Sequence, residues 1–556
     1  MDKANHKSTF INKIHSEYIE SQNSNKITKR QYIHFDQLVF SGKMSEKTIT
    51  KKAEILFDTW YTELGQKKHN FLPLLRVNSV IKKHYLIKNV KKVKKEIKKD
   101  KKYHIKPRPL TYCGHLDKII YLFWGIIWED LYEKKLLELG LQDNVLAYRK
   151  IPKNNYSNKS NIDFARDAFE SVKLNVYNNQ QCTTIALDIS SFFDNISHNT
   201  IKENLTYLTD REKLDYFDYK IFKQITNYNF IDKKRLLQNI LLIKNKKQLT
   251  KFIYGYTNRK QCKEHHKTEF ERQKQNKKLK QRLSAEEYTN QKQHKEEYFG
   301  QFCKKNKGIK EIIKKIRAFE ITNPGKNLIY TKNNKNYGIP QGLPISGLIS
   351  NISLIKIDIQ IKELCSLYSI TYYRYCDDIL LVIPSNSEVD SLLIKDLVID
   401  ILQFNKGEKY NRELEKYETK PFLEINNKKT EIRKFELCKD KVDCFEIENN
   451  NKTKRKPMQY LGFNFDGQNI TIRQSGISKY YSKMRRSIKS IKCLFKKRKY
   501  QNLPFKRIRL QYKDEKKRYL KYVDNSFHGM ENNNKIKRQV SKRLVVLNSL
   551  LESRIN

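Results

Sequence analysis

Three aspartates in this sequence stand where carboxylates can hold metal ions. Asp188 ends the apolar run 184–187, and Asp377 and Asp378 lie side by side between the segments TYYRYC and ILLVI. Neighbouring carboxylates raise each other's pKa, so a cation should offset them. Carboxylate oxygens suit hard divalent cations, and two such ions stabilise both the attacking and the leaving oxygen of a phosphoryl displacement. The residue types therefore indicate two-metal phosphoryl transfer.

Short β segments must position these acids. The apolar run before Asp188 predicts a buried strand that ends at this residue, and the residues around Asp377 and Asp378 predict two strands joined by a tight turn. A solvated surface turn is the alternative for a lone Asp-Asp pair, but apolar and aromatic neighbours on both sides disfavour it. A further β-rich segment is expected at 337–354, and the periodicity of 116–139 predicts one or two core helices.

The chemistry-bearing segments fall into a familiar order. In this order they resemble the two fingers motifs and motifs A to E of a reverse transcriptase: KPRPL (106–110), AYRKI (147–151), LDISSFFDNI (187–196), GIPQGLPISGLISN (338–351), YRYCDDILLV (373–382), LEINNKKTEI (423–432) and QYLGFNFDG (459–467). The combination is far more specific than any motif singly. The resemblance covers roughly residues 101–556.

The resemblance implies an α+β fold, a right-hand polymerase with fingers, palm and thumb. A small antiparallel palm sheet is expected, with mostly helical structure elsewhere. The expected divisions are a basic helical N-terminal region (1–100), fingers (101–182), palm with motif A (183–242), a basic helical insertion (243–317), palm with motifs B to E (318–470) and a helical thumb or C-terminal domain (471–556). The Lys-rich run 89–102 is read as a solvated amphipathic helix.

The resemblance also implies a reaction and its metal ligands. Asp188 and Asp377 would bind two Mg²⁺ ions, with Mn²⁺ as a substitute; the Ile189 carbonyl would add a ligand, and Asp378 would complete or orient the site. A primer 3′-hydroxyl would attack the α-phosphate of a dNTP and release pyrophosphate. Lys429 resembles the motif D lysine that protonates the leaving pyrophosphate; a β-turn lysine without a catalytic role is the alternative.

Two arginines are the candidates to clamp the triphosphate. They are Arg108 of KPRPL and Arg149 of AYRKI, because guanidinium forks match phosphate oxygens bidentately. Either Lys102 or Lys106 is an alternative to Arg108.

Motifs A, B and E add candidate contacts to nucleotide and primer. Phe193 stands where the family places a bulky side chain under the sugar, which would select dNTPs over NTPs; core packing is the alternative, since side chains of adjacent strand residues alternate faces. Gln341 and Gly342 are expected to lie close to the templating base and the incoming nucleotide. A tight β-turn at Leu461 and Gly462 would support the primer terminus.

Composition limits the class of protein and its partners. The chain of 556 residues has 113 Lys and Arg against 61 Asp and Glu, a formal net charge of +52, which favours a polyanionic partner. With 17 Gly and 11 Pro it is not fibrous or loop-rich. Nine cysteines without a secretory signal predict free thiols and a cytoplasmic location. The longest apolar run, 119–128, is too short for a membrane span of ~20 residues, so no membrane contact is expected.

Several lineages and activities remain open. The segment 115–151, the SGLISN form of motif B and the long insertion between motifs A and B resemble bacterial defence-associated reverse transcriptases more than group II intron or retron enzymes. This implies antiphage defence, an RNA template, a DNA product and dNTPs, with a structured noncoding RNA or a homo-oligomer in some members. The alternatives are template-independent or protein-primed DNA synthesis, an RNA-dependent RNA polymerase, and a catalytically silent nucleic-acid-binding scaffold.

Overall fold

The structure is a computed structural model in which two compact units can be described. The described residues are 3–23, 45–61, 71–84, 103–239, 309–325, 327–331, 336–385, 390–411, 416–448, 451–496, 517, 519–531 and 533–552. Unit 1 is drawn from residues 1–135, 193–257 and 282–353, and unit 2 from residues 136–192, 258–281 and 354–556. The three candidate acids all belong to unit 2.

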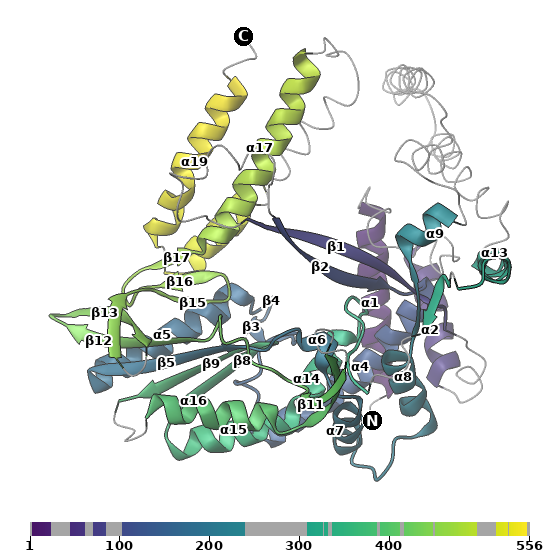
Figure 1. The fold of residues 1–556 in the computed structure, drawn as a ribbon, viewed down its shortest axis with the longest axis horizontal. Coiled ribbons are helices and arrows are strands. Elements are labelled where there is room, and N and C mark those ends of the chain that lie inside the picture. The colour runs from purple at the N-terminus through teal and green to yellow at the C-terminus, as the bar shows by residue number, and fades with distance from the viewer. Residues whose placement is uncertain are drawn as a thin grey trace. The chain divides into compact units, whose positions relative to one another are not determined.

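A six-stranded antiparallel sheet forms the frame of unit 2 (Figure 1). Its strands follow the order β14 (Asn451–Arg455), β13 (Lys441–Glu448), β12 (Glu431–Cys438), β5 (Gln181–Asp188), β9 (Asp378–Pro384) and β8 (Thr371–Tyr375). Helix α5 (Asn161–Asn179) covers one face, and α15 (Ile355–Leu367) and α16 (Ser391–Gln403) cover the other. β9 is therefore buried from Ile379 onward, which explains its uninterrupted apolar run.

Local sequence signals fix the ends of α5. Ser160 is the N-cap, and together with Asp163 it forms a capping box that satisfies free amides of the first turn. The helix ends at Gln180, which adopts a left-handed φ of 65°. Directly after this turn the chain enters β5, so α5 packs against the strand that carries Asp188.

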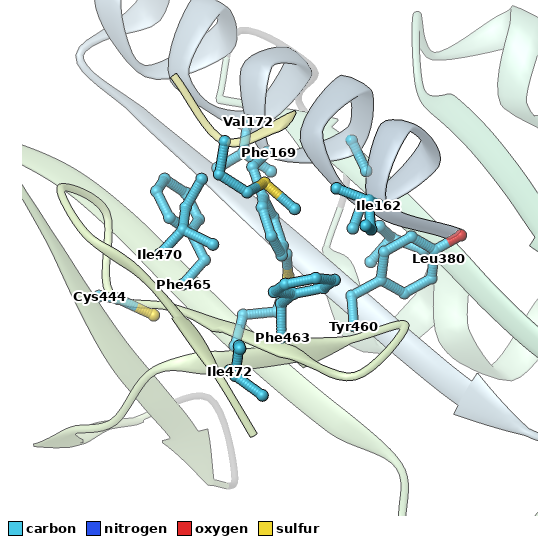
Figure 2. Close-up of a cluster of buried hydrophobic side chains, with 14 of the residues drawn as sticks. Ile162, Phe169, Val172, Leu380, Cys444, Tyr460, Phe463, Phe465, Ile470 and Ile472 are labelled. Carbon is cyan, nitrogen blue, oxygen red and sulfur yellow. The ribbon is translucent and has the colours of Figure 1, made fainter. Parts of the chain in front are cut away.

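A second, three-stranded sheet packs on α5 and leads into two helices. It consists of β15 (Met458–Tyr460), β16 (Phe463–Phe465) and β17 (Ile470–Ile472). Figure 2 shows Phe463 and Phe465 beneath Phe169 of α5, in a buried cluster that also includes Val172 and Ile472. All regular structure described after β17 is helical and includes α17 (Gln474–Lys496) and α19 (Asn534–Glu552). Gln539 of α19 bonds both the amide and the carbonyl of Ile472, which ties α19 to the sheet.

Unit 1 combines a helical cluster with a four-stranded sheet. The sheet order is β2 (Tyr103–Tyr112), β1 (Leu74–His84), β6 (Asn229–Asp232) and β7 (Ile329–Thr331). Helices α1 (Lys3–Asn23), α2 (Glu46–Tyr61) and α4 (His115–Glu138) meet through aromatic rings, with Phe123 contacting Phe10, Phe57 and Trp60. The prediction of core helix over 116–139 is confirmed, since α4 is one continuous helix.

Shorter elements complete the described chain. They are β3 (Pro152–Asn154), β4 (Ser157–Asn158), α6 (Phe192–Asn195), α7 (His198–Leu208), α8 (Tyr216–Thr226), α9 (Lys233–Asn239), α13 (Ile309–Thr322), α14 (Ser346–Ile352), β10 (Lys406–Asn411) and β11 (Lys416–Pro421). No helix in the described ranges is long and apolar enough to cross a membrane.

Three local predictions are wrong. The segment 337–354 is not β-rich: it is irregular up to Ile345 and then helical in α14, because prolines 340 and 344 lack the amide that a strand ladder needs. Phe192 and Phe193 lie in the short helix α6 rather than in a strand. Within the region expected to be helical, residues 74–84 form strand β1. The run 89–102 and most of 243–317 lie outside the described residues.

Candidate active site

Two strands of the unit 2 sheet bring the acids together. β5 ends at Asp188, β9 begins at Asp378, and these two residues are direct partners in the antiparallel register. The amide of Ile189 donates to the carbonyl of Asp377 at 3.0 Å. Carboxylates that are far apart in sequence thus lie together at one end of two inner strands, because the end of β5 is paired with the start of β9.

A tight turn sets the position of Asp377. It joins β8 to β9 through Cys376, whose φ of 61° is left-handed. The Cys376 side chain is buried and its Sγ lies 3.7 Å from the hydroxyl of Tyr148. Burial is the main cause that raises the pKa of this thiol to about 12, so Cys376 is a packing residue rather than a nucleophile.

A buried ion pair supports the same turn from below. Arg374 donates from Nε and Nη2 to the two carboxylate oxygens of Asp358 at 2.7 and 2.6 Å, and both side chains are almost completely buried. Arg374 Nη1 also donates to the carbonyl of Cys376 at 3.3 Å. Tyr372 donates its hydroxyl to Asp358 at 2.6 Å. The bidentate pair therefore fixes β8 to α15 directly beneath the acids.

The acids carry more negative charge than their surroundings offset. Burial is the largest cause that raises the pKa of Asp378, to about 7, and the charges of Asp377 and Asp188 add to it. Burial, followed by the charge of Asp188, also raises the pKa of Asp377. Lys429 and Arg473 act in the opposite direction on Asp378. The cation that the Asp-Asp pair was expected to need is thus supplied in part by two basic side chains.

Lys429 makes direct contact with Asp188 at the end of β5. Its Nζ lies 2.5 Å from Oδ1 of Asp188, with the lysine side chain 55% exposed and the aspartate 14%. Backbone bonds hold the segment in place: Ser190 donates to Glu424 at 2.7 Å, and Asn426 donates to Asp188 at 2.8 Å. The motif D segment is therefore attached to the end of β5, and Lys429 reaches the acids from a turn.

The donor set suits a hard divalent cation. The carboxylates of Asp188, Asp377 and Asp378 and the carbonyl of Ile189 are all oxygen ligands, and their unbalanced charge favours a cation. In the described part of the chain, no three His, Cys, Asp or Glu side chains are already grouped as a metal site. The arrangement is thus a group of oxygen ligands at the ends of two strands rather than a preformed metal site, and Lys429 pairs with one of the carboxylates.

Arg149 lies on a segment that runs beside β8. Leu146 donates to the carbonyl of Arg374 at 2.9 Å, and Arg374 donates to that of Asn144 at 2.7 Å. Arg149 turns Nη1 to the carbonyls of Gln142 at 2.6 Å and Val145 at 2.5 Å. These bonds place Tyr148 next to the turn at Cys376 and hold the arginine against its own loop, so triphosphate binding by Arg149 stays a prediction.

The candidate primer grip is the turn between β15 and β16. Leu461 and Gly462 have φ values of 43° and 96°, the left-handed pair of a tight hairpin turn. Asn161 donates to the carbonyl of Leu461 at 3.2 Å, and the amide of Arg473 donates to that of Gly462 at 2.9 Å. The expected turn is present, and it is anchored to α5 and to the residue after β17.

The other nucleotide-site candidates belong to unit 1. Phe193 is half-buried, and its carbonyl accepts from Ile339 at 2.8 Å. The carbonyl of Gln341 accepts from both the amide and the hydroxyl of Thr111. Gly342 has a φ of 114°, and an added Cβ would lie 2.5 Å from the Thr111 carbonyl. Glycine is thus required by the neighbouring strand β2, while its expected role beside the templating base stays a prediction.

Arg108 lies on β2, where it is exposed and faces Ser79 in the register of β1. The nucleotide-binding roles of Arg108, Phe193 and Gln341 are predictions, since they lie in unit 1 and the acids lie in unit 2.

Sequence reasoning missed several supporting residues. Arg473, Tyr148 and the Arg374–Asp358 pair all act on the acids or their turn. Arg473 directly follows the motif E strands, and Arg374 lies within the motif C segment. Their positions offered a weak signal, but nothing in the sequence pairs Arg374 with Asp358 or brings Arg473 to Asp378.

Comparison with known proteins points to one family. Residues 223–465 match the family model described as reverse transcriptase (RNA-dependent DNA polymerase), a stretch that includes Asp377, Asp378 and Lys429 and begins after Asp188. No curated protein matches the chain.

Two solved telomerases show structural similarity. Apo telomerase from Candida tropicalis, truncated from its C-terminal domain, has 10% identity and a TM-score of 0.31, covering 76% of this chain and 66% of that one. Telomerase from Candida albicans, in complex with a TWJ fragment of telomeric RNA, has 11% identity and a TM-score of 0.32, covering 90% of this chain and 65% of that one. This chain thus spans less than two thirds of the length of each.

Proposed function

Since residues 223–465 match the reverse transcriptase family model, we propose that this chain is an RNA-directed DNA polymerase. The observation that carries the proposal is that Asp188 and Asp378 are paired where β5 ends and β9 begins. Asp377 is adjacent to this pair, and Lys429 contacts Asp188. Such a cluster of half-buried acids with raised pKa values is costly to a fold and is found where charge is needed for chemistry. A nucleic-acid-binding scaffold would have no use for it.

The residues divide the work of nucleotidyl transfer. Asp188, Asp377 and the Ile189 carbonyl would hold two Mg²⁺ ions with Asp378 beside them, and when bound these ions would supply positive charge against the oxygens of the reacting phosphate. The primer 3′-hydroxyl gives up its proton to water as its oxygen forms a bond to the α-phosphorus of the dNTP, and the bond from this phosphorus to the oxygen that bridges to the β-phosphate breaks. Lys429 donates a proton to the leaving pyrophosphate.

The remaining candidates bind and select the substrates. Arg108 and Arg149 bind the triphosphate, Gln341 and Gly342 lie against the base pair that forms, and the Leu461–Gly462 turn supports the primer end. These assignments rest on the motif resemblance.

The proposal is tested by nucleotide incorporation. The purified chain is given a primed RNA template, one labelled dNTP and Mg²⁺, and products are separated by length. We expect extension that follows the template sequence and stops when Mg²⁺ is chelated. Extension that is unchanged when the template is omitted would replace the proposal with template-independent DNA synthesis.

Phe193 provides a separate test of sugar selection. The change Phe193→Ala is expected to raise NTP use relative to dNTP use by about 10-fold or more, because removing one steric clash relaxes discrimination by about 1–3 kcal/mol. Phe192, the buried neighbour, is the matched control: Phe192→Leu should leave the NTP to dNTP ratio unchanged. An unchanged ratio in Phe193→Ala would favour the RNA polymerase alternative or a packing role.

We further propose that the polymerase acts in bacterial antiphage defence. The support is the resemblance of residues 115–151 and of the SGLISN segment to defence-associated enzymes. Phage should form fewer plaques on a bacterium that expresses the chain than on one that expresses the Asp377→Asn variant at equal protein level. Equal plaque numbers across a broad phage panel would argue against the defence role and leave the polymerase activity untouched.

A further inference from the structure

Four side chains form a ladder on one face of the unit 1 sheet. Phe230 of β6 and Tyr330 of β7 are direct partners in the antiparallel register, so both point to the same face. The flanking partners Ile231 and Ile329 point to the opposite face, where Leu75, Leu236 and Ile316 form a buried cluster with Ile231. The sheet therefore has an apolar inner face and an outer face with aromatic rings.

The rings are stacked and each is covered by a guanidinium. The centroids of Phe230 and Tyr330 are 5.4 Å apart with planes 22° from parallel. Arg76 of β1 lies 5.0 Å from the Phe230 centroid, and Arg235 of α9 lies 5.2 Å from the Tyr330 centroid. We call these four side chains the sheet-face ladder. Cation–π contact of this kind restricts the guanidinium without using its N–H donors.

Neither guanidinium has an acidic partner among the described residues. Asp232 is the register partner of Arg76, yet it forms no ion pair with it; its Oδ1 instead accepts from the amides of Lys234 and Arg235 at the start of α9. Within the part of the chain that the structure describes, the N–H groups of both arginines are thus held in place and left for a ligand. Lys234, also exposed, adds charge nearby.

A similar arrangement on unit 2 shows the contrast. Lys452 and Arg455 of β14 lie 4.3 and 5.8 Å from the ring of Phe445. Both are neutralised, since Lys452 contacts Glu436 at 2.5 Å and Arg455 contacts Asp443 at 2.6 Å. Cations over a ring are therefore not by themselves a binding site in this protein. The sheet-face ladder differs because no carboxylate of the described ranges forms an ion pair with Arg76 or Arg235.

The ligand chemistry follows from the two guanidinium groups, each of which can bind an anion through two N–H donors. Arg76 lies over one ring of the stacked pair and Arg235 lies over the other, so each guanidinium can contact an anionic group of its own. A strand with repeating phosphates satisfies both at once, whereas a single phosphate engages one. We propose that the sheet-face ladder is a binding surface for the phosphate backbone of single-stranded nucleic acid. The choice of nucleic acid over other polyanions rests on the proposed function.

The test measures binding by the full-length chain without Mg²⁺ or dNTPs. Fluorescein-labelled 20-nucleotide RNA and DNA strands of one unstructured sequence are titrated by anisotropy at several salt concentrations between about 50 and 200 mM. The double change Arg76→Gln with Arg235→Gln should weaken binding of both strands. It should also reduce the slope of log K against log[salt] by about 1.4, which is about 0.7 for each lost phosphate contact.

Two further variants make the result specific. Lys452→Gln with Arg455→Gln removes two ion-paired cations over a ring and should leave affinity and slope nearly unchanged. Arg76→Lys with Arg235→Lys retains charge but loses the planar guanidinium groups, so it should keep the slope and lose part of the affinity. A melting temperature of the Arg76→Gln, Arg235→Gln variant equal to that of wild type excludes collapse of unit 1 as the cause of its weaker binding.

Three outcomes would overturn the proposal. They are an unchanged affinity in the Arg76→Gln, Arg235→Gln variant, an equal loss in the Lys452→Gln, Arg455→Gln control, and a loss confined to RNA, which would indicate contact with the 2′-hydroxyl rather than with phosphate. A wild type that binds through the ladder but never incorporates dNTPs would remove the proposed function and leave this binding surface standing.

Discussion

Replacing Asp377 with Asn is expected to reduce Mg²⁺-dependent dNTP incorporation by at least ~10³-fold, equivalent to about 4 kcal/mol of lost transition-state stabilisation. The side chain keeps its shape and its place in the turn after Cys376, but it loses the charge that a hard divalent cation prefers. Removing an acid also relieves the repulsion that raises the pKa values of Asp377 and Asp378. The variant should therefore fold at least as well as wild type.

A matched control separates charge at the site from charge in general. Asp440 is an exposed turn aspartate of the same unit, with a left-handed φ of 62° that asparagine tolerates well. Asp440→Asn makes the same change in charge and should leave incorporation within about twofold of wild type. Single-nucleotide extension in the presence of Mg²⁺ measures both. Full activity in Asp377→Asn would contradict the polymerase assignment.

Breaking the buried pair beneath the acids should have the largest effect on stability. Asp358→Asn leaves Arg374 buried without its charged partner, and it replaces one of the two oxygens that accept from Arg374 and Tyr372 with an amide donor. Loss of one partner of such a pair costs about 3–5 kcal/mol. We expect a clear fall in the urea concentration at the unfolding midpoint, measured by far-UV circular dichroism. Incorporation should also be lost, because Arg374 bonds the carbonyl of Cys376.

The design of this experiment includes a rescue and a surface control. Arg374→Met with Asp358→Leu removes both charges and should be less destabilised than either single change, since no uncompensated charge remains. Asp443→Asn breaks the exposed pair with Arg455, whose members are 2.6 Å apart, and should cost less than about 1 kcal/mol. Equal costs for Asp358→Asn and Asp443→Asn would show that burial of the Arg374 pair has no energetic consequence.

Local sequence was sufficient for the elements that carry the acids. The apolar run before Asp188, the tight turn at Asp377 and the hairpin turn at Leu461 and Gly462 are each present in the structure. Each depends on interactions within a few residues: period-two burial, turn propensity and the freedom of glycine at positive φ. The helix α4 was predictable for the same reason, since its apolar periodicity is continuous.

The same local rules failed where context decides. The apolar residues of 346–352 suit a strand or a buried helix equally, and the structure places them in α14. Residues 74–84 lie in an N-terminal region that is polar and basic as a whole, yet they form β1, which pairs with β2 over residues 75–84 and with β6 over residues 74–76. Such pairing depends on segments that are distant in the chain, so no short window of sequence reveals it.

The sequence alone determined which residue types are available for catalysis, the order of the motifs, the strong positive charge and the local turns that present the acids. Only the tertiary structure decided that Asp188 pairs with Asp378, that Lys429 and Arg473 offset part of the acids' effect on Asp378, that Asp358 holds Arg374, and that two rings orient Arg76 and Arg235. The physical reason is that strand register and side-chain burial are set by packing between distant segments. The residue type determines the charge and shape of a side chain, but the fold determines which partner that side chain contacts.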